Sequence, residues 1–127
     1  MTNADGDVPR DAALGALKII QNTVDAAVVL RVHGELDIAT IHCLDEQLGR
    51  AEADVTPPAP VVLDLTGVTF MGSAGLASLV RHRDRCAEHG SALRLVAPNR
   101  EVLRPIQLTG MDEELVTFAT VDDALNH

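Results

Sequence analysis

The chain has 127 residues, the usual size of one domain with a single hydrophobic core, and 46% of them are hydrophobic, which argues against a wholly disordered chain. Its net charge of −9 and its two aromatic residues, both phenylalanine, argue against a nucleic-acid surface built on phosphate contacts or base stacking. No apolar run is long enough to span a membrane, and the polar, acidic first residues do not form a signal peptide. We therefore expect a cytoplasmic protein that contacts neither nucleic acid nor membrane.

The chain is predicted to begin with a flexible tail, followed by one domain that opens with a β-hairpin. Residues 1–13 are mostly polar and make up the tail, and residues 14–127 make up the domain. Leu17–Val24 is predicted to be the first strand and Ala27–Val32 the second, because both are rich in apolar, β-branched residues. Asp25-Ala26 between them predicts a tight turn and hence an antiparallel pair.

A break at His33–Asp37 is predicted to separate the hairpin from the first helix. Four apolar residues share one face of that helix at helical spacing: Ile41, Leu44, Leu48 and Ala51. On the same helical wheel Cys43 points away from this face, so we expect it near solvent. The prolines in Thr56–Pro60 predict a loop after the helix, because neither a helix nor a central strand accommodates them.

The middle of the chain is predicted to contain a buried strand and a second helix. Val61–Leu65 suits a central strand, and Thr66–Gly72 leads out of it. Ser73 then opens the helix, and Gly90 ends it. The residues predicted to face inward are Leu76, Leu79, Val80 and Ala87, and those predicted to face outward are Arg81, Arg85 and Glu88. Cys86 lies at the margin of the apolar face and is expected to be a small core residue.

The last third of the chain is predicted to alternate strand and helix twice more. The elements are a strand at Ala92–Val96, a helix at Arg100–Leu108 with Asn99 as its N-cap, an edge strand at Leu115–Ala119 and a short helix at Val121–Asn126 capped by Thr120. Gly110 is expected to end the longer of these helices. This alternation predicts an α/β layered domain.

The turn Gly72-Ser73-Ala74-Gly75-Leu76 is the first candidate for a functional site. It places the Ser73 hydroxyl at the start of a helix, where unpaired backbone N–H groups accept anions, so a phosphate attached there would be stabilised locally. The glycines on either side allow close approach by a partner's backbone or active site. The same residues also fit an ordinary N-cap, in which the hydroxyl only accepts a bond from the helix backbone.

A hydrolase is the alternative against which this turn is tested. The nucleophile elbow has the pattern G-x-S-x-G, and Met71 occupies the position where the first glycine belongs. His82, His89 and His127 could serve as bases, yet so small a chain with so few aromatic residues offers little substrate pocket. We therefore predict no catalytic residue and no enzymatic activity.

Metal and cofactor binding are not indicated either. The histidines form no H-x-x-x-H pair, and His82 and His89 lie seven residues apart on what we expect to be a solvated helix face. No P-loop pattern occurs. Cys43 and Cys86 are too few for a disulfide scaffold, and a redox role for the more exposed Cys43 stays open. We predict no metal site and no cofactor.

Three segments, in this order, give the sequence a family resemblance. They are Gly34-Glu35-Leu36-Asp37, then Asp64 to Leu76 (DLTGVTFMGSAGL), and then Leu108-Thr109-Gly110-Met111-Asp112. Their order and spacing resemble the STAS domain of anti-sigma factor antagonists over residues 14–126. The resemblance implies the α/β STAS fold, a small mixed sheet of four or five strands with about four helices packed against it.

The resemblance also implies a function and a site. Members bind an anti-sigma factor that is also a serine kinase, and so release a sigma factor for transcription. The kinase phosphorylates a serine or threonine at the start of the second helix, and a phosphatase restores it. On this chain Ser73 is the implied phosphoacceptor. The implied partner-binding residues are Asp37, Gly72, Ser73, Ala74, Gly75 and Leu76.

The turn departs from the family pattern D-S-[ST]-G-L at two positions. Gly72 replaces the aspartate, and Ala74 replaces the second hydroxyl residue, which leaves Ser73 as the single acceptor at the turn. A constitutive STAS scaffold, which makes protein contacts without control by phosphorylation, is therefore the alternative function.

Overall fold

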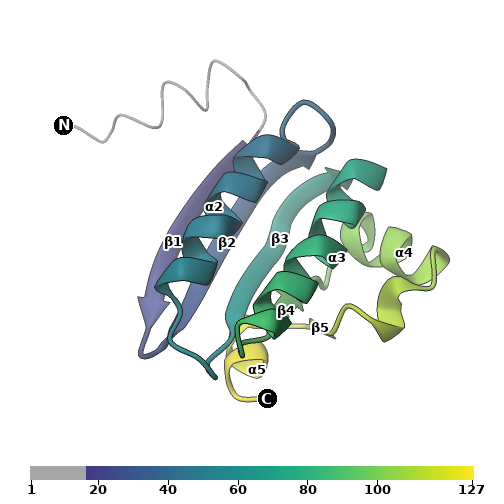
Figure 1. The fold of residues 1–127 in the computed structure, drawn as a ribbon. Coiled ribbons are helices and arrows are strands. Elements are labelled where there is room, and N and C mark those ends of the chain that lie inside the picture. The colour runs from purple at the N-terminus through teal and green to yellow at the C-terminus, as the bar shows by residue number, and fades with distance from the viewer. Residues whose placement is uncertain (1–16) are drawn as a thin grey trace.

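A five-stranded mixed sheet forms the centre of the fold, in a computed structural model that describes residues 17–127 (Figure 1). The strands lie side by side in chain order, with β1 antiparallel to β2 and all later neighbours parallel. They are β1 (Leu17–Val24), β2 (Ala27–Leu36), β3 (Val61–Met71), β4 (Leu93–Val96) and β5 (Thr117–Phe118). The predicted α/β class and mixed sheet are confirmed, and the tail predicted at residues 1–13 lies outside the described residues.

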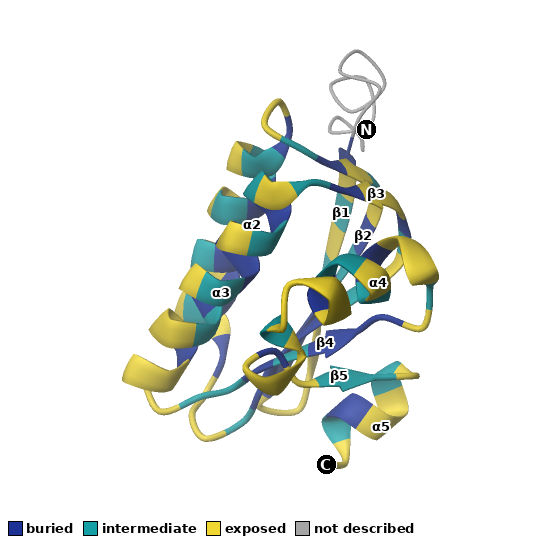
Figure 2. Cartoon of the chain, turned by 90° about the vertical axis from the view of Figure 1, so that its right-hand side faces the viewer, coloured by how far each residue is buried: buried dark blue, intermediate teal, exposed yellow. Residues whose placement is uncertain are grey.

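Helices connect the parallel strands and cover the sheet. They are α2 (Ile41–Asp54), α3 (Ser73–Glu88), α4 (Arg100–Leu108), the 3₁₀ turn η1 (Met111–Glu113) and the short α5 (Val121–Leu125). Because crossovers between parallel strands are right-handed and the sheet order follows the chain order, the connecting helices lie on one face. Figure 1 shows α2 and α3 side by side across that face. Figure 2 shows α5 on the opposite side of the sheet.

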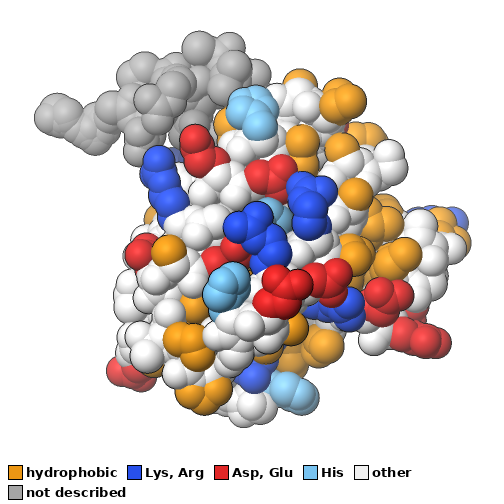
Figure 3. All heavy atoms as spheres, in the orientation of Figure 1, with side chains coloured by type: hydrophobic (Ala, Val, Ile, Leu, Met, Phe, Trp, Pro, Cys, Tyr) orange, Lys and Arg blue, Asp and Glu red, His pale blue; other side chains and the backbone are white. Residues whose placement is uncertain are grey.

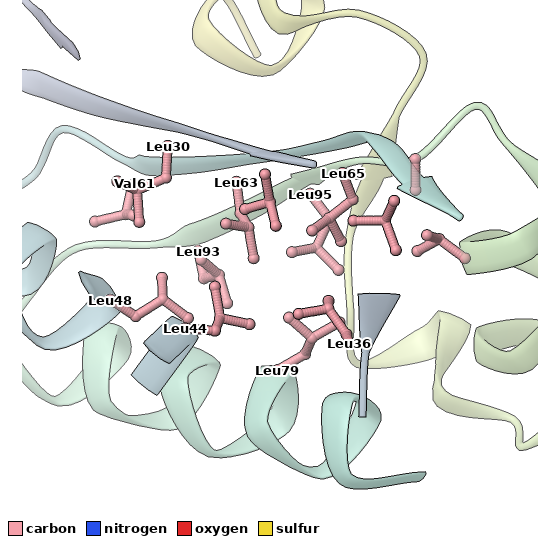
Figure 4. Close-up of a cluster of buried hydrophobic side chains, with 14 of the residues drawn as sticks. Leu30, Leu36, Leu44, Leu48, Val61, Leu63, Leu65, Leu79, Leu93 and Leu95 are labelled. Carbon is pink, nitrogen blue, oxygen red and sulfur yellow. The ribbon is translucent and has the colours of Figure 1, made fainter. Parts of the chain in front are cut away.

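The main core fills the space between the sheet and helices α2 and α3. Figure 4 shows Leu30, Leu63 and Leu95 of the strands together with Leu44 and Leu79 of the helices in this layer. All five side chains are completely buried. Burying one leucine side chain stabilises a fold by about 1.5–3 kcal/mol relative to leaving it exposed, so this row of leucines fixes the helices against the sheet.

A smaller cluster lies on the other face of the sheet. Its buried members are Val29, Val62 and Val96 from the three central strands and Ala124 from α5. The neighbours of these valines in sequence face the main core, so both faces of the central strands are covered. This explains why the central strands are apolar at consecutive positions.

The second and third strands are longer than the sequence pattern predicts. A break is expected at His33–Asp37, but β2 continues to Leu36, and β3 runs to Met71 and not only to Leu65. Gly34 reads as a strand breaker, yet it takes a φ of 122° at an irregularity in the pairing, and the two strands stay paired beyond it. The longer strands place Leu36 beside Met71 at the carboxyl ends of β2 and β3, which form one edge of the sheet.

The later elements match their predictions more closely. Helix α4 begins and ends where the sequence predicts, and Thr120 caps α5 by accepting a hydrogen bond from the Asp123 N–H at 3.1 Å. β5 is an edge strand as expected, but it is only two residues long. Asn99 holds the N-cap position of α4, but its side chain instead donates to the Leu65 and Val68 carbonyls at 3.1 and 2.8 Å. This side chain therefore ties the start of α4 to β3.

Three helix residues lie on a different face from the predicted one. Ala87 is exposed, and Cys43 is half-buried against the main core. His82, expected on a solvated face, is 1% exposed. The buried stripe of α3 consists of Gly75, Ser78, Leu79, His82 and Cys86. Cys86 is buried as expected, whereas a pattern that counts only apolar residues misses the polar members of the stripe.

Candidate functional site

The serine turn is fixed to the ends of two neighbouring strands. Gly72 is the N-cap of α3, and Ser73 is the first residue of the helix. The Gly72 N–H donates to the Leu36 carbonyl of β2 at 2.9 Å, and the Gly72 carbonyl accepts from the Leu76 N–H at 3.2 Å. The alternative prediction that Ser73 is an ordinary N-cap is therefore wrong, because Gly72 holds that position. Its side chain is exposed and has no hydrogen-bond partner among residues 17–127.

The start of α3 is an electropositive helix end without a neighbouring carboxylate on its own first turn. The first backbone N–H groups of any helix lack partners within it and carry a partial positive charge. Here the first turn contains no acidic residue, and no side chain caps it. An anion attached at Ser73 would therefore be stabilised by the helix on which it sits.

The loop after β2 lies beside this turn. Leu36 pairs with Met71, so Asp37 and Ser73 follow neighbouring strands at the same edge of the sheet. The Asp37 carboxylate accepts from the backbone N–H groups two and three residues later, at 2.9 and 3.2 Å. This carboxylate thus shapes the loop that follows β2.

The two glycines of the turn differ in their surroundings. A Cβ at Gly75 would lie 2.9 Å from the Met71 Cγ and 3.1 Å from the Leu36 Cβ, so the close packing of α3 on the strand ends requires glycine there. Gly75 is buried, which leaves it almost no surface to offer a partner. A Cβ at Gly72 would come no nearer than 3.4 Å to the Phe70 ring, so this position has room for a side chain.

The other predicted contact residues are at the surface only in part. Ala74 and Leu76 are half-buried, and Leu76 packs against the main core. Ser73 is the exposed member of the turn, and Asp37 and Gly72 beside it are half-buried. The structure thus brings the predicted residues to one edge of the sheet and presents the Ser73 hydroxyl at that edge.

Three exposed apolar side chains that are not among the predicted site residues lie at or next to the ends of β2, β3 and α4. They are Ile38, Phe70 and Leu108, exposed by 85%, 50% and 73%. Ile38 follows Asp37 in the loop, and Phe70 and Leu108 line one groove beside the turn. They are half of the six large apolar side chains that are exposed among residues 17–127. Exposed apolar side chains that gather at one site mark an interaction surface.

A polar cluster ties the second half of α3 to α2. The His82 Nδ1 lies 2.5 Å from a Glu52 carboxylate oxygen, and the Nε2 lies 2.9 Å from an Asp45 oxygen. The ring can donate to both carboxylates only in its doubly protonated, positively charged form. The side chains of His82 and Glu52 are 1% and 7% exposed, so this contact is buried. The sequence feature that could have predicted this burial is spacing: His82 lies three residues after Leu79 and four before Cys86, on the buried face of α3.

Asp45 collects three donors from α3. The Ser78 hydroxyl donates to it at 2.5 Å, the Arg81 guanidinium lies 3.0 Å from both of its oxygens, and His82 contacts it as described. Burial tends to raise the pKa of Asp45, but the hydrogen bonds from Ser78 and His82 and the charge of Arg81 together hold that pKa below its ordinary value. Figure 3 shows side chains of both charges gathered over α2 and α3.

The buried thiol near this cluster is unreactive. Burial, and then the charge of Glu52, raise the pKa of the Cys86 thiol to about 12, so it stays protonated. Among residues 17–127 no group of three His, Cys, Asp or Glu side chains is placed to hold a metal ion. Within the same range, none of the helices has the length and apolar character needed to cross a bilayer.

Comparisons relate the chain to known proteins. The family profile described as the STAS domain matches residues 18–124. The anti-sigma-F factor antagonist RsfA of Mycobacterium tuberculosis is 35% identical over 111 residues, which are 87% of each chain. A crystal structure of an anti-sigma factor antagonist from Mycobacterium paratuberculosis has a TM-score of 0.79 and 33% identity, covering 87% of this chain and 92% of that one. SpoIIAA in its unphosphorylated form shares the fold, with a TM-score of 0.66 at 23% identity over 86% of this chain and 94% of its own.

Proposed function

The chain belongs to the STAS domain family, and from this premise we propose that it is an anti-sigma factor antagonist that is switched off by phosphorylation at Ser73. Relatives that are 35% identical over 87% of the chain carry the name anti-sigma-F factor antagonist. Such a protein acts by binding and not by catalysis. It binds an anti-sigma factor in the cytoplasm and thereby frees a sigma factor for transcription.

The observation that carries the proposal is the exposed Ser73 hydroxyl at a helix start that has no acidic residue and no side-chain cap within residues 17–127, with exposed apolar side chains nearby. Ile38 lies in the loop after β2, Phe70 lies at the end of β3, and both are exposed. Gly72 and Ala74 on either side of the serine are small and uncharged. Apolar and small neutral groups of this kind suit the water-excluded centre of a protein interface.

A phosphate on Ser73 would oppose binding without disturbing the fold. It adds a charge of about −1.5 to −2 at neutral pH. In the unbound chain this charge lies at the positive end of α3 and in water, so the helix tolerates it. In a complex it must lose its water against the partner surface, next to the exposed apolar side chains of Ile38 and Phe70. The partner is therefore released, while the domain keeps its structure.

The proposed kinase is the anti-sigma factor itself, and Ser73 is its acceptor. The other serine of α3, Ser78, is completely buried and donates to Asp45, so no kinase reaches it in the folded chain. Ser73, in contrast, is exposed at the start of the helix. A phosphatase that removes the phosphate would return the chain to its binding form.

A constitutive scaffold is the second candidate, and the composition of the turn favours it. Gly72 and Ala74 stand where the family pattern has an aspartate and a second hydroxyl residue. A kinase that recognises that aspartate would not phosphorylate this turn. The chain would then bind its partner through the same surface at all times.

Phosphate transfer separates the two candidates. Purified kinase-type anti-sigma factors of the source organism would each be incubated with the chain and ATP, and the product mapped by mass spectrometry. We expect one phosphate, on Ser73, and none on a Ser73→Ala variant. Ser78→Ala serves as the matched control and should still be phosphorylated. A complex that forms without any phosphate transfer, and that Ser73→Asp leaves unchanged, would instead establish the scaffold.

A further inference from the structure

We propose that the groove beside the serine turn receives an apolar side chain from an acidic segment of the partner, which on the proposed function is the anti-sigma factor. The groove lies between the end of β3 and α4, and Figure 2 shows α4 on the outside of the molecule, with exposed residues along its outer side. Its apolar wall consists of Phe70 and Met71 from the strand and Pro105 and Leu108 from the helix. Phe70 and Leu108 are two of the most exposed apolar side chains of residues 17–127.

The size and shape of the groove favour a protein side chain over a small molecule. Its volume is about 240 Å³. Pockets for small molecules usually measure about 300–1,000 Å³ and enclose most of the ligand. A shallow apolar groove with Phe70 and Leu108 on its rim suits one large apolar side chain that projects from a partner's surface, as interface anchors do.

The charges on α4 favour an acidic partner segment. Arg100 and Arg104 lie one turn apart on this helix, and both line the groove and are exposed. Neither forms an ion pair with another residue in the range 17–127. Glu101 is the one acidic residue in the described part of the chain that lines the groove, so the two arginines leave a positive local charge there, although the net charge of the chain is −9. Arginine binds carboxylates with two parallel hydrogen bonds, which makes Asp or Glu the complementary group.

The groove is continuous with the serine turn. Phe70 and Met71 line the groove, and Gly72 and Ser73 follow directly in the chain. One partner can therefore cover both features at the same time. A phosphate on Ser73 would place negative charge beside the docking position of an acidic segment, and neighbouring like charges repel. The groove thus explains how a single phosphate could weaken contacts outside the turn itself.

Selection of binding peptides tests the groove without the anti-sigma factor. A phage-displayed library of random peptides would be selected on the unphosphorylated chain. We expect enriched peptides with a large apolar residue next to Asp or Glu. The affinity of the corresponding synthetic peptide should fall at least about tenfold for Leu108→Ser and for Arg104→Glu.

The matched controls carry the same changes elsewhere on the surface. Val24→Ser removes an exposed apolar side chain at the hairpin, the end of β2 opposite to the serine turn. Arg50→Glu reverses an exposed arginine on α2. Both should leave the peptide affinity unchanged, and all four variants should keep the wild-type melting temperature because every altered side chain is exposed.

Three results would overturn the inference. They are the absence of an enriched apolar and acidic motif, peptide binding that ignores Leu108→Ser and Arg104→Glu, and a dimer of the wild-type chain that Leu108→Ser dissociates in analytical ultracentrifugation. The last result would show that a second copy occupies the groove. Peptide binding as expected, together with no binding to any kinase-type anti-sigma factor, would support the groove and contradict the proposed function.

Discussion

The start of helix α3 is open and rich in exposed apolar neighbours, whereas its second half is bound to helix α2 by charged side chains. At the start, Ser73 is exposed and has no hydrogen-bond partner within residues 17–127. Nine residues later, His82 lies buried between Glu52 and Asp45. In Figure 3 hydrophobic side chains gather at the upper right, over the start of α3 as placed in Figure 1, and charged side chains gather over its middle.

This contrast indicates that one half of the helix holds the other half in place. A binding site is most effective when the element that carries it is rigid. The contacts of His82 with Glu52 and Asp45 and the packing of Gly75 against the strand ends fix α3, so the Ser73 hydroxyl can be presented without support of its own. A modification at Ser73 would then change the surface and leave the fold intact.

The largest effect is expected from removing His82, which links the second half of α3 to α2. His82→Ala leaves the Glu52 and Asp45 carboxylates without the ring that contacts both, and removing the partner of a buried carboxylate costs roughly 3–5 kcal/mol of unfolding free energy. Urea unfolding followed by circular dichroism measures this loss. Arg83→Ala, which removes a more exposed pair with Asp84, should cost less than about 1 kcal/mol. A loss as small as this for His82→Ala would contradict the anchoring role.

A smaller effect is expected in the first turn of α3, at Gly75. Gly75→Ala forces a Cβ against Met71 and Leu36, and overpacking of this kind costs about 1–3 kcal/mol. Gly49→Ala is the matched control on α2, because nothing lies within 4 Å of the Cβ it adds. That change should stabilise the chain by about 0.5–1 kcal/mol through helix propensity. Equal effects of the two substitutions in urea unfolding would show that the start of α3 is not tightly packed.

The contacts between the second half of α3 and Asp45 of α2 should also make the unfolding free energy depend on pH. The pKa of Asp45 is lowered in the folded chain, so its contribution is fully present above its unfolded value near 3.8 and is lost as the pH falls through the lower folded value. Asp45 is one-third exposed, so solvent screening keeps this contribution small. Unfolding free energies measured between neutral pH and about pH 3 should fall less steeply for Asp45→Asn than for the wild type. A steeper fall in the variant would contradict the assignment.

The smallest effect on stability is expected at Gly72, the N-cap of α3. Gly72→Asp restores the carboxylate of the family pattern at an N-cap with room for it, and should stabilise the chain by a few tenths of a kcal/mol up to about 1 kcal/mol. Gly72→Asn separates the two causes, because it supplies the cap without the charge. Thermal unfolding at low salt measures both variants. A destabilised Gly72→Asp variant would show that the turn is less open than Gly72 and Phe70 indicate.

The fold was predictable from the sequence where local pattern decides it. Periodicity and turn residues place the hairpin, the three longer helices and the edge strand, because these depend on neighbours along the chain. The full lengths of β2 and β3 were not predictable, since they depend on pairing between distant segments. Gly34 reads as a break in one strand, and its role becomes clear only when the partner strand is in place beside it.

The site was predictable in part. The family pattern and the helix start led to Ser73, which the structure presents at the surface. The exposure of Ile38 and Leu108 could not be read from their apolar character, which predicts burial. The sequence pattern predicts a solvent-facing His82, because a histidine in an amphipathic pattern counts as polar. Its burial depends on carboxylates of another helix, Asp45 and Glu52, some 30 or more positions away in the sequence.

The most direct test compares the affinity of one kinase-type anti-sigma factor for the unphosphorylated chain and for the chain phosphorylated on Ser73, by titration calorimetry. The account predicts that phosphorylation weakens binding by at least about a hundredfold, because the charge must be desolvated at the interface. The unfolding free energies of the two forms should agree within about 1 kcal/mol. Equal affinities of the two forms would contradict the account.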